Sequence, residues 1–295
     1  MKHIMLTGAV LALAGCASVT DAPQVDVQRG NAAAIETAAI HARTLTLDTH
    51  VDIPLTYMSE IDPGAVTDLQ VDLGKLEAGG LDAAFFIVYT PQGDLTEAGY
   101  AAAAKIAETR ISAIQALTKK YYDRAELAKT AGDVHRIVKS GKHTVLVGME
   151  NAYPLGGSID DVKMWADRGV RYVGLTHFGH NQFGDSSNPD FTRDSGPRHN
   201  GLSPLGRDLV NALNEHGIMV DVSHTGKETM MQAADLSRTP IIASHSGVKA
   251  VADSARNLDD EQLRKIRDVD GVAQMVALDN YVKPFTKAQG EFREA

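Results

Sequence analysis

Five side chains of the types that bind divalent metals stand where short apolar runs end: His50, Asp52, Glu150, His224 and His245. The runs are TLTLDTHVD, TVLVGMEN, IMVDVSH and PIIASHS. In a parallel barrel the C-terminal ends of successive strands meet at one mouth, where barrel enzymes keep their chemistry. The pattern therefore predicts one metal site of the kind used for hydrolysis.

The two carboxylates of this set, Asp52 and Glu150, are predicted to bind metal for different reasons. His50 and Asp52 are two residues apart, so in a strand both side chains point to the same face and can share one cation. Taken alone, such a pair occurs by chance in many chains. Glu150 follows a run that should be buried, where an unpaired carboxylate is costly and a metal removes the cost. The alternative for Glu150 is a capping or salt-bridging role.

The two histidines each close an apolar run in the dipeptide Ser-His, at His224 and His245. Neutral imidazole at a barrel mouth suits zinc or a similar divalent ion. Singly, each is better explained as a buried, hydrogen-bonded core histidine. The joint occurrence of all five residues at strand ends is what favours a metal site.

The rest of the chain alternates between strand-like and helix-like segments. Strands are expected near 44–53, 81–90, 144–151, 171–177, 218–224, 240–246 and 271–278, and helical patterns lie between them, among them 97–122, 158–169, 203–217, 226–237 and 259–268. Such alternation predicts βαβ units and a parallel sheet. The expected fold is an α/β barrel of the TIM-like (β/α)8 type with about seven of eight units present. A doubly wound open sheet is the alternative, but no glycine-rich phosphate motif follows the first strand.

Composition excludes one class of partner. The chain has 295 residues, 43% of them hydrophobic and 23% charged, with a formal net charge of -9. Nucleic-acid binding needs a basic face, and no Lys/Arg-rich stretch occurs.

The N-terminus has the pattern of a targeting segment. Lys2 and His3 precede an apolar run over 4–14, too short to span a bilayer, and this run ends in Leu-Ala-Gly-Cys. That ending resembles the lipobox of bacterial lipoproteins, which implies cleavage before Cys16 and lipidation of its thiol; an ordinary secretory signal is the alternative. Cys16 is the one cysteine of the chain, so an intrachain disulfide is excluded.

These features predict three parts: a lipoprotein signal peptide (1–15), a lipidated N-terminus and tether (16–40), and a metal-dependent hydrolase barrel (41–295). The predicted location is the cell envelope, with the domain in the periplasm and the outer membrane favoured.

From about residue 47 to 278 the sequence resembles the membrane dipeptidases, also called renal dipeptidase-like metallopeptidases, of the amidohydrolase superfamily. The motifs that carry the resemblance are LDTHVDIP, KLEAGGLDAAFFIVYTPQG, VGMEN, YVGLTHFGHN, GLSPLGRDLVNALNEHGIMVDVSH, IIASHSGVKAV and ARNLDDEQLRKI.

The resemblance implies a site for two Zn²⁺, with His50 and Asp52 on one ion, Glu150 bridging, and His224 and His245 on the other. The same ligands would accept manganese or cobalt. It implies hydrolysis of small dipeptides by a metal-bridging hydroxide, since two such ions activate water and polarise a carbonyl. The family is often dimeric, so a homodimer is the assembly it suggests.

Two further residues take their expected roles from the resemblance. His177 would contact the substrate and the tetrahedral intermediate, and Arg256 would hold the substrate carboxylate. The alternatives are a hydrogen-bonded loop histidine for His177 and a surface arginine for Arg256, beside a helix capped by Asn257 or Asp259. His180 is a weaker substitute for His177, and His199 is expected to be exposed.

One element of the family is missing from the sequence. The resembled enzymes carry a further aspartate after an eighth strand, as proton shuttle, and nothing after Leu278 matches it. The expectation is a C-terminally truncated chain, and two functions of different class follow. The first is an active zinc dipeptidase; the second is an inactive or binding-only lipoprotein that keeps the metal site. Another hydrolase of the superfamily, acting on a lactone or cyclic amide, is a third alternative.

Overall fold

The computed structural model describes residues 36–283 and residue 289. The predicted signal peptide, Cys16 and most of the predicted tether lie outside the described residues. Residues 36–43 are helical and belong to a separate compact unit that ends at Thr44, whereas Leu45 onward forms the second unit. No described helix has both the length and the apolar character needed to cross a bilayer.

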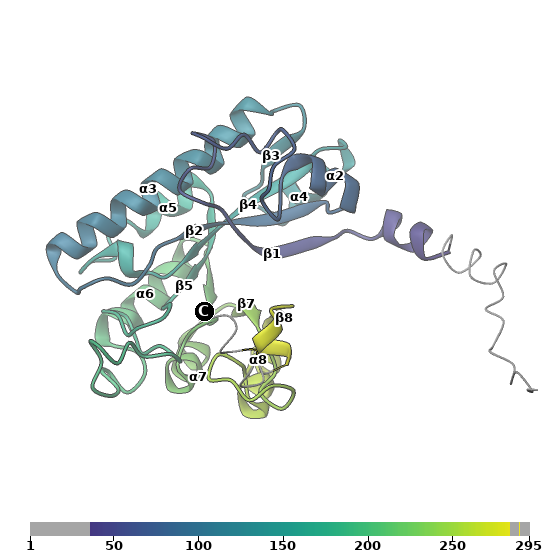
Figure 1. The fold of residues 1–295 in the computed structure, drawn as a ribbon. Helices are drawn as coiled ribbons and strands as arrows, with labels where there is room; N and C mark the ends of the chain where they lie inside the picture. The colour runs from purple at the N-terminus through teal and green to yellow at the C-terminus, as the bar shows by residue number, and fades with distance from the viewer. Residues whose placement is uncertain (1–35, 284–288, 290–295) are drawn as a thin grey trace, which may run out of the picture. The chain divides into compact units, whose positions relative to one another are not determined.

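The second unit is built on a parallel sheet with helices along its outside (Figure 1). The strands are β1 (Leu47–Asp52), β2 (Ala83–Tyr89), β3 (Ala125–Leu127), β4 (His143–Glu150), β5 (Val170–Gly174), β6 (Met219–Asp221), β7 (Ile242–Ser246) and β8 (Val272–Met275). The helices are α2 (Leu73–Gly79), α3 (Glu97–Lys120), α4 (Ala131–Lys139), the 3-10 turn η1 (Tyr153–Leu155), α5 (Val162–Arg168), α6 (Pro204–Glu215), α7 (Lys227–Leu236), α8 (Asp260–Asp268) and α9 (Asp279–Val282).

Seven strands follow one another in the order β1-β2-β4-β5-β6-β7-β8, all in parallel. The nearly closed barrel confirms the predicted TIM-like class. The three-residue strand β3 was not predicted; among the described strands it pairs only with the beginning of β4. Its sequence, Ala-Glu-Leu, is too short to show a strand period.

The apolar strands divide their side chains between two layers. Alternate residues of a strand point to opposite faces. On β2, Phe86 and its even-numbered neighbours pack in the main core with helix residues such as Ile111 of α3. The odd-numbered residues, including Phe85, pack instead with Leu146 and Tyr172 on the other face of the strands. Tyr89, the last residue of β2, packs against this second cluster and extends it to the C-terminal end of the strand.

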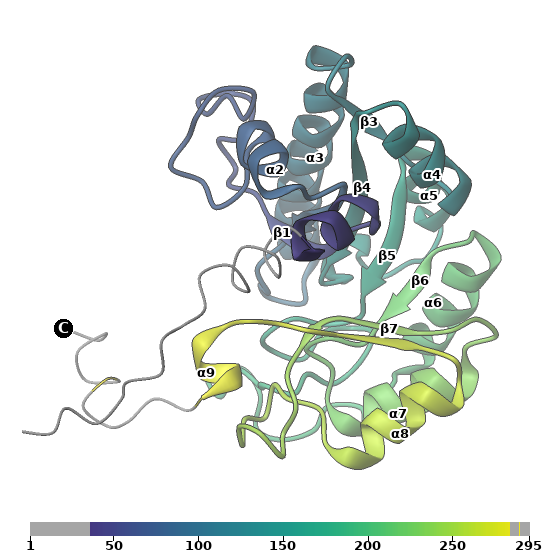
Figure 2. The same cartoon turned by 90° about the vertical axis from the view of Figure 1, so that its right-hand side faces the viewer.

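The ring is open between β1 and β8. Among the described residues, β1 pairs only with β2 and β8 only with β7. The Thr49 hydroxyl donates to the Ser244 carbonyl (2.6 Å), so the middle of β1 approaches the middle of β7 without strand pairing. Figure 2 shows β8 running beside β7, above α7 and α8. Both edges of this seam expose apolar side chains, Leu47 on β1 and Val272 and Met275 on β8.

Candidate metal centre

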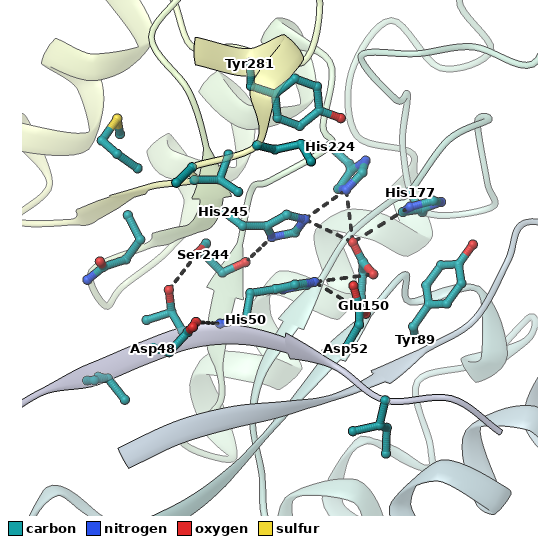
Figure 3. A pocket seen from close by; sticks show the side chains of 18 of the residues that line it. Asp48, His50, Asp52, Tyr89, Glu150, His177, His224, Ser244, His245 and Tyr281 are labelled. Carbon is teal, nitrogen blue, oxygen red and sulfur yellow. Dashed lines mark hydrogen bonds and ion pairs between the residues drawn. The ribbon is translucent and has the colours of Figure 1, made fainter. Parts of the chain in front are cut away.

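Glu150 is the centre of a cluster of imidazoles at the C-terminal ends of the strands (Figure 3). It is the last residue of β4 and is only 4% exposed. Its Oε1 lies 3.0 Å from Nε2 of His224 and 3.1 Å from Nε2 of His245. These two nitrogens are themselves 3.0 Å apart. Three atoms with lone pairs therefore converge on one small region.

His50 approaches the other oxygen of the same carboxylate. Its Nε2 is 3.6 Å from Oε2 of Glu150, and its ring stacks on His245 with 3.6 Å between centroids. On the opposite side, Nε2 of His177 lies 3.8 Å from Oε1 of Glu150. Two groups of donor atoms result, His50 with Glu150 and His245, and His177 with Glu150 and His224. Glu150 belongs to both groups, as a bridging ligand would.

The backbone at two strand ends is left-handed. His224 has a φ of 68° and Asn151, directly after Glu150, has a φ of 76°. Such values are costly for residues other than glycine and cluster at functional sites. His224 follows the short strand β6 by three residues, so its imidazole is aimed by a turn and not by the strand alone.

The electrostatics favour the protonation state that a metal requires. Burial alone would raise the pKa of Glu150, but the imidazoles of His224, His245 and His50 beside its oxygens hold that pKa well below its usual range. Burial lowers the pKa of His224 far below its ordinary value and that of His245 to about 3. The carboxylate is therefore ionised and these two imidazoles are neutral at neutral pH, as metal ligands must be.

The donor set fits a divalent cation. Neutral imidazoles 3.0 Å apart and next to a carboxylate oxygen would present lone pairs to one another, which a cation or a proton between them relieves. Imidazole and carboxylate ligands suit zinc and its neighbours. The described cluster can therefore bind metal.

Asp52 lies at the rim of this cluster. Its Oδ1 is 3.8 Å from Nε2 of His50, and its side chain is 69% exposed. It belongs to neither of the two groups around Glu150. Of the five predicted ligands, the structure thus brings four together tightly and leaves Asp52 at their edge.

His177, the predicted substrate contact, is part of the cluster. Its ring lies between Tyr89 and Phe178, with centroid distances of 4.8 and 4.6 Å. Burial lowers the pKa of His177, so its imidazole is neutral at neutral pH. His180 is buried, accepts from the Ser186 backbone N–H, and belongs to neither group of donor atoms around Glu150.

Arg256 lies behind His245 rather than over the ligands. It is 3% exposed, and its guanidinium donates to the His245 carbonyl (2.7 Å) and to the Ser246 hydroxyl (3.0 Å). It lines a second pocket, of about 350 Å³, that it shares with His224. Arg256 is therefore not a surface residue, and Asp259 is the residue that caps α8. His199 is half-buried instead of exposed, and its Nε2 lies 3.0 Å from the Asn181 carbonyl.

A larger pocket of about 830 Å³ lies over the metal-ligand cluster. Its walls include Tyr89, Phe178 and Tyr281, and it continues into the seam, between Leu47 of β1 and the segment 274–278 after β8. The opening of the ring and the opening of the pocket therefore coincide.

Arg110 lines the same pocket and was missed by sequence reasoning. It extends from α3, is 9% exposed, and donates to the carbonyls of Ile53 (3.1 Å) and Tyr89 (2.8 Å), just beyond β1 and at the end of β2. An arginine in a long alanine-rich helix reads as a surface residue, so no signal in the sequence would have found it.

Comparison with known proteins identifies relatives of the chain. The model of a family described as membrane dipeptidase (peptidase family M19) matches residues 35–291. A dipeptidase of Claviceps purpurea, tcpJ, is 37% identical over 206 residues, covering 68% of this chain and 47% of the relative. The dipeptidase verJ of Clonostachys rogersoniana is 31% identical over 240 residues, covering 77% and 60%. The chain thus spans about half the length of the curated relatives it matches.

A solved structure gives a similar result. The probable dipeptidase PvdM of Pseudomonas aeruginosa superposes with a TM-score of 0.81 at 32% identity. The superposition covers 88% of this chain and 66% of that protein.

Proposed function

Because the chain belongs to the membrane dipeptidase family, peptidase family M19, we propose that it is a zinc-dependent dipeptidase that cleaves the amide bond of small dipeptides. The observation that carries the proposal is Glu150, whose two oxygens face imidazoles from different strands. A lone buried carboxylate would be costly at this position, and a metal centre accounts for it.

In the proposed centre, His224 and His245 would hold one zinc ion, since their Nε2 atoms lie 3.0 Å apart beside Oε1 of Glu150. His50 and Asp52 would hold the other, on the side of Oε2, so Glu150 would contribute to both. When bound, two such ions activate a water molecule and polarise the scissile carbonyl. The exposed side chain of Asp52 needs only a rotation about its own bonds to join His50, since their nearest polar atoms are 3.8 Å apart.

The surrounding residues bind and orient the substrate. Neutral His177 beside Glu150 donates its ring N–H to the oxygen that becomes negative in the transition state. We assign the substrate carboxylate to Arg256, whose buried guanidinium borders the second pocket next to His224. Two of its five N–H groups donate to Ser246 and His245, and its buried Nε has no partner among the described residues, so donors remain for this role.

The second candidate is a binding-only protein with the same metal site. It is favoured by Asp279, the first acidic residue after β8, which starts α9 and is exposed rather than turned to the ligands. Hydrolysis of a series of dipeptides by the zinc-loaded chain decides between the two. We expect turnover that a chelator abolishes and zinc restores; zinc binding without turnover would establish the second candidate.

We also propose that Cys16 carries the lipid that anchors the chain at the periplasmic face of the outer membrane. In a bacterial host, the full chain is expected in the membrane fraction and Cys16→Ala in the soluble periplasm. An equal distribution of both would contradict the anchor. A homodimer stays a prediction, which the mass in solution tests.

A further inference from the structure

His50 has a hydrogen-bond partner on the side of its ring that faces away from Glu150. Its Nδ1 lies 3.0 Å from the Tyr172 hydroxyl. That hydroxyl donates its single proton to the Thr49 carbonyl, 3.0 Å away. Its oxygen can therefore only accept at His50, which requires the proton of a neutral His50 to be on Nδ1.

His245 has an equivalent partner from a different source. Its Nδ1 lies 2.8 Å from the Ser244 hydroxyl, and that hydroxyl lies 2.7 Å from Oδ2 of Asp221. A carboxylate oxygen only accepts, so the Ser244 proton points to Asp221 and the Ser244 oxygen accepts from Nδ1 of His245. The other oxygen of Asp221 accepts the backbone N–H groups of Ser223 (3.0 Å) and Ser244 (2.9 Å), which fixes the carboxylate.

We propose that Tyr172 and the Asp221–Ser244 pair are positioning residues that fix the Nδ1–H tautomers of His50 and His245, leaving both Nε2 lone pairs for metal. This inference rests on the metal centre of the proposed function. Partners of this kind, which hold the non-ligating nitrogen of a histidine, typically contribute 10- to 100-fold to metal affinity.

The core is shaped to admit Tyr172. Its ring is fully buried beneath the cluster, and a Cβ atom at Gly148 would lie 2.2 Å from the ring carbon that bears the hydroxyl. Glycine at this position of β4 therefore makes room for the tyrosine that reaches His50. Asp221 is 1% exposed. Burial of a carboxylate costs free energy unless hydrogen bonds compensate it, and here the donors are Ser223 and Ser244.

His224 differs from the other two ligands. Its Nδ1 is buried and has no hydrogen-bond partner within the described part of the chain. Its ring is aimed by the left-handed backbone at this residue, not by a hydroxyl. The tautomer-fixing contacts are thus confined to His50 and His245. His224, which lacks such a contact, is the internal control for each experiment.

The tautomers can be read directly in the metal-free full chain. Long-range ¹H–¹⁵N spectra at about pH 8, above the ordinary pKa of histidine, distinguish protonated from bare ring nitrogens. We expect Nδ1 of both His50 and His245 to carry a proton and Nε2 of both to be bare once the imidazoles are neutral. A bare Nδ1 on either residue would overturn the inference, and this result does not depend on catalysis or on metal loading.

Asp221→Asn tests the direction of the Ser244 hydrogen bond. The new amide keeps its oxygen on the two backbone N–H groups and turns its NH₂ to Ser244, so the hydroxyl donates to His245 and moves the imidazole proton to Nε2. We expect a loss of zinc affinity of roughly 100-fold, larger than the roughly 10-fold loss for Ser244→Ala, which only removes the restraint. Equal affinities in Asp221→Asn and the parent chain would refute the role of Asp221.

Tyr172→Phe tests the second partner, with an expected loss of roughly 10-fold in zinc affinity. Tyr153→Phe is the matched control, because its buried hydroxyl donates to the Asp94 carbonyl away from the ligands. Asp72→Asn is the control for Asp221→Asn, since Asp72 is a buried carboxylate that caps α2. Both controls should lose thermal stability but bind zinc like the parent; if they lose affinity equally, the effect is general destabilisation and the inference fails.

If hydrolysis is absent but the tautomers and affinities behave as expected, the catalytic proposal fails and the positioning role stands. The converse result, turnover with unchanged affinity in all three variants, would remove the positioning role alone.

Discussion

β2 and β8 are both parallel strands of the same ring, but they are packed in opposite ways. On β2, six of seven residues are buried, and strands pair with both of its edges. On β8, no residue is buried, and only β7 pairs with it among the described strands. The difference shows that the site has a rigid side, on which β4 beside β2 ends in Glu150, and an open side between β1 and β8, which the pocket enters.

The largest effect is expected on the rigid side. Phe86→Ala on β2 removes a ring that is 1% exposed and leaves a cavity between the sheet and α3. The loss in free energy of unfolding should be about 3–5 kcal/mol, as for other buried phenylalanines. Urea denaturation measures it, and a loss below about 1 kcal/mol would show that β2 is not the packed side of the ring.

Arg110→Met tests how the rigid side is tied together. The methionine keeps the apolar stem of the side chain but leaves the carbonyls of Ile53 and Tyr89 without their donor. We expect a loss of about 2 kcal/mol, in the range for hydrogen bonds to charged groups. Arg193→Met is the control: this half-exposed arginine donates to the Gln92 carbonyl at the outer loop. Equal losses in the two variants would argue against a clamp between β1 and β2.

The ligand histidines should make the metal-free protein less stable in acid. The pKa of His245 falls from 6.5 unfolded to about 3 folded, and that of His224 is also lowered. The unfolded chain therefore binds more protons between these values, so stability rises with pH across this window. Each histidine contributes a slope of about 1.4 kcal/mol per pH unit. His50 acts in a different window: burial lowers its pKa, but Glu150, Asp52 and Asp221 together raise it above 6.5, so its contribution is constant in acid and is lost only as pH rises above that value.

Denaturation of the metal-free chain between about pH 4 and 7 measures this slope. In His245→Gln the slope should be smaller by roughly one proton. An unchanged slope in that variant would mean that His245 is not held neutral by its burial.

The smallest effect is expected on the open side. Met275→Ser on β8 replaces a side chain that is 51% exposed at the seam. The free energy of unfolding should change by less than about 0.5 kcal/mol, as for exposed positions generally. A loss comparable to that of Phe86→Ala would mean that the seam is covered in solution, and would remove the contrast between the two sides.

The sequence predicted the rigid side better than the open one. Strands such as AAFFIVY are wholly apolar because both of their faces are covered. The same run of apolar residues therefore predicts the strand and explains its burial. Glu150, His224 and His245 could be predicted because each interrupts such a run. The partners behind them could not: Tyr172 reads as an ordinary core residue, and Asp221 and Ser244 acquire their role only through contacts between neighbouring strands.

Asp52 shows the limit of a spacing argument. Two residues on the same face of a strand should point together, but β1 has an irregular register with β2 between Asp48 and Val51. The side chain of Asp52 consequently lies at the rim, and only its distance to His50 links it to the cluster. Residue spacing predicts which face of a strand a side chain points to. It does not predict an irregularity in the pairing of that strand, which changes where the side chain lies.

The central claim is that Glu150 joins two metal ions, and metal stoichiometry tests it most directly. Elemental analysis of the zinc-loaded chain after dialysis should give about two equivalents, the number expected for a bridged hydrolytic site. Glu150→Gln should retain one at most, whereas Glu126→Gln, a half-buried glutamate on β3 outside the cluster, should retain both. Two equivalents in Glu150→Gln, or none in the parent chain, would contradict the account.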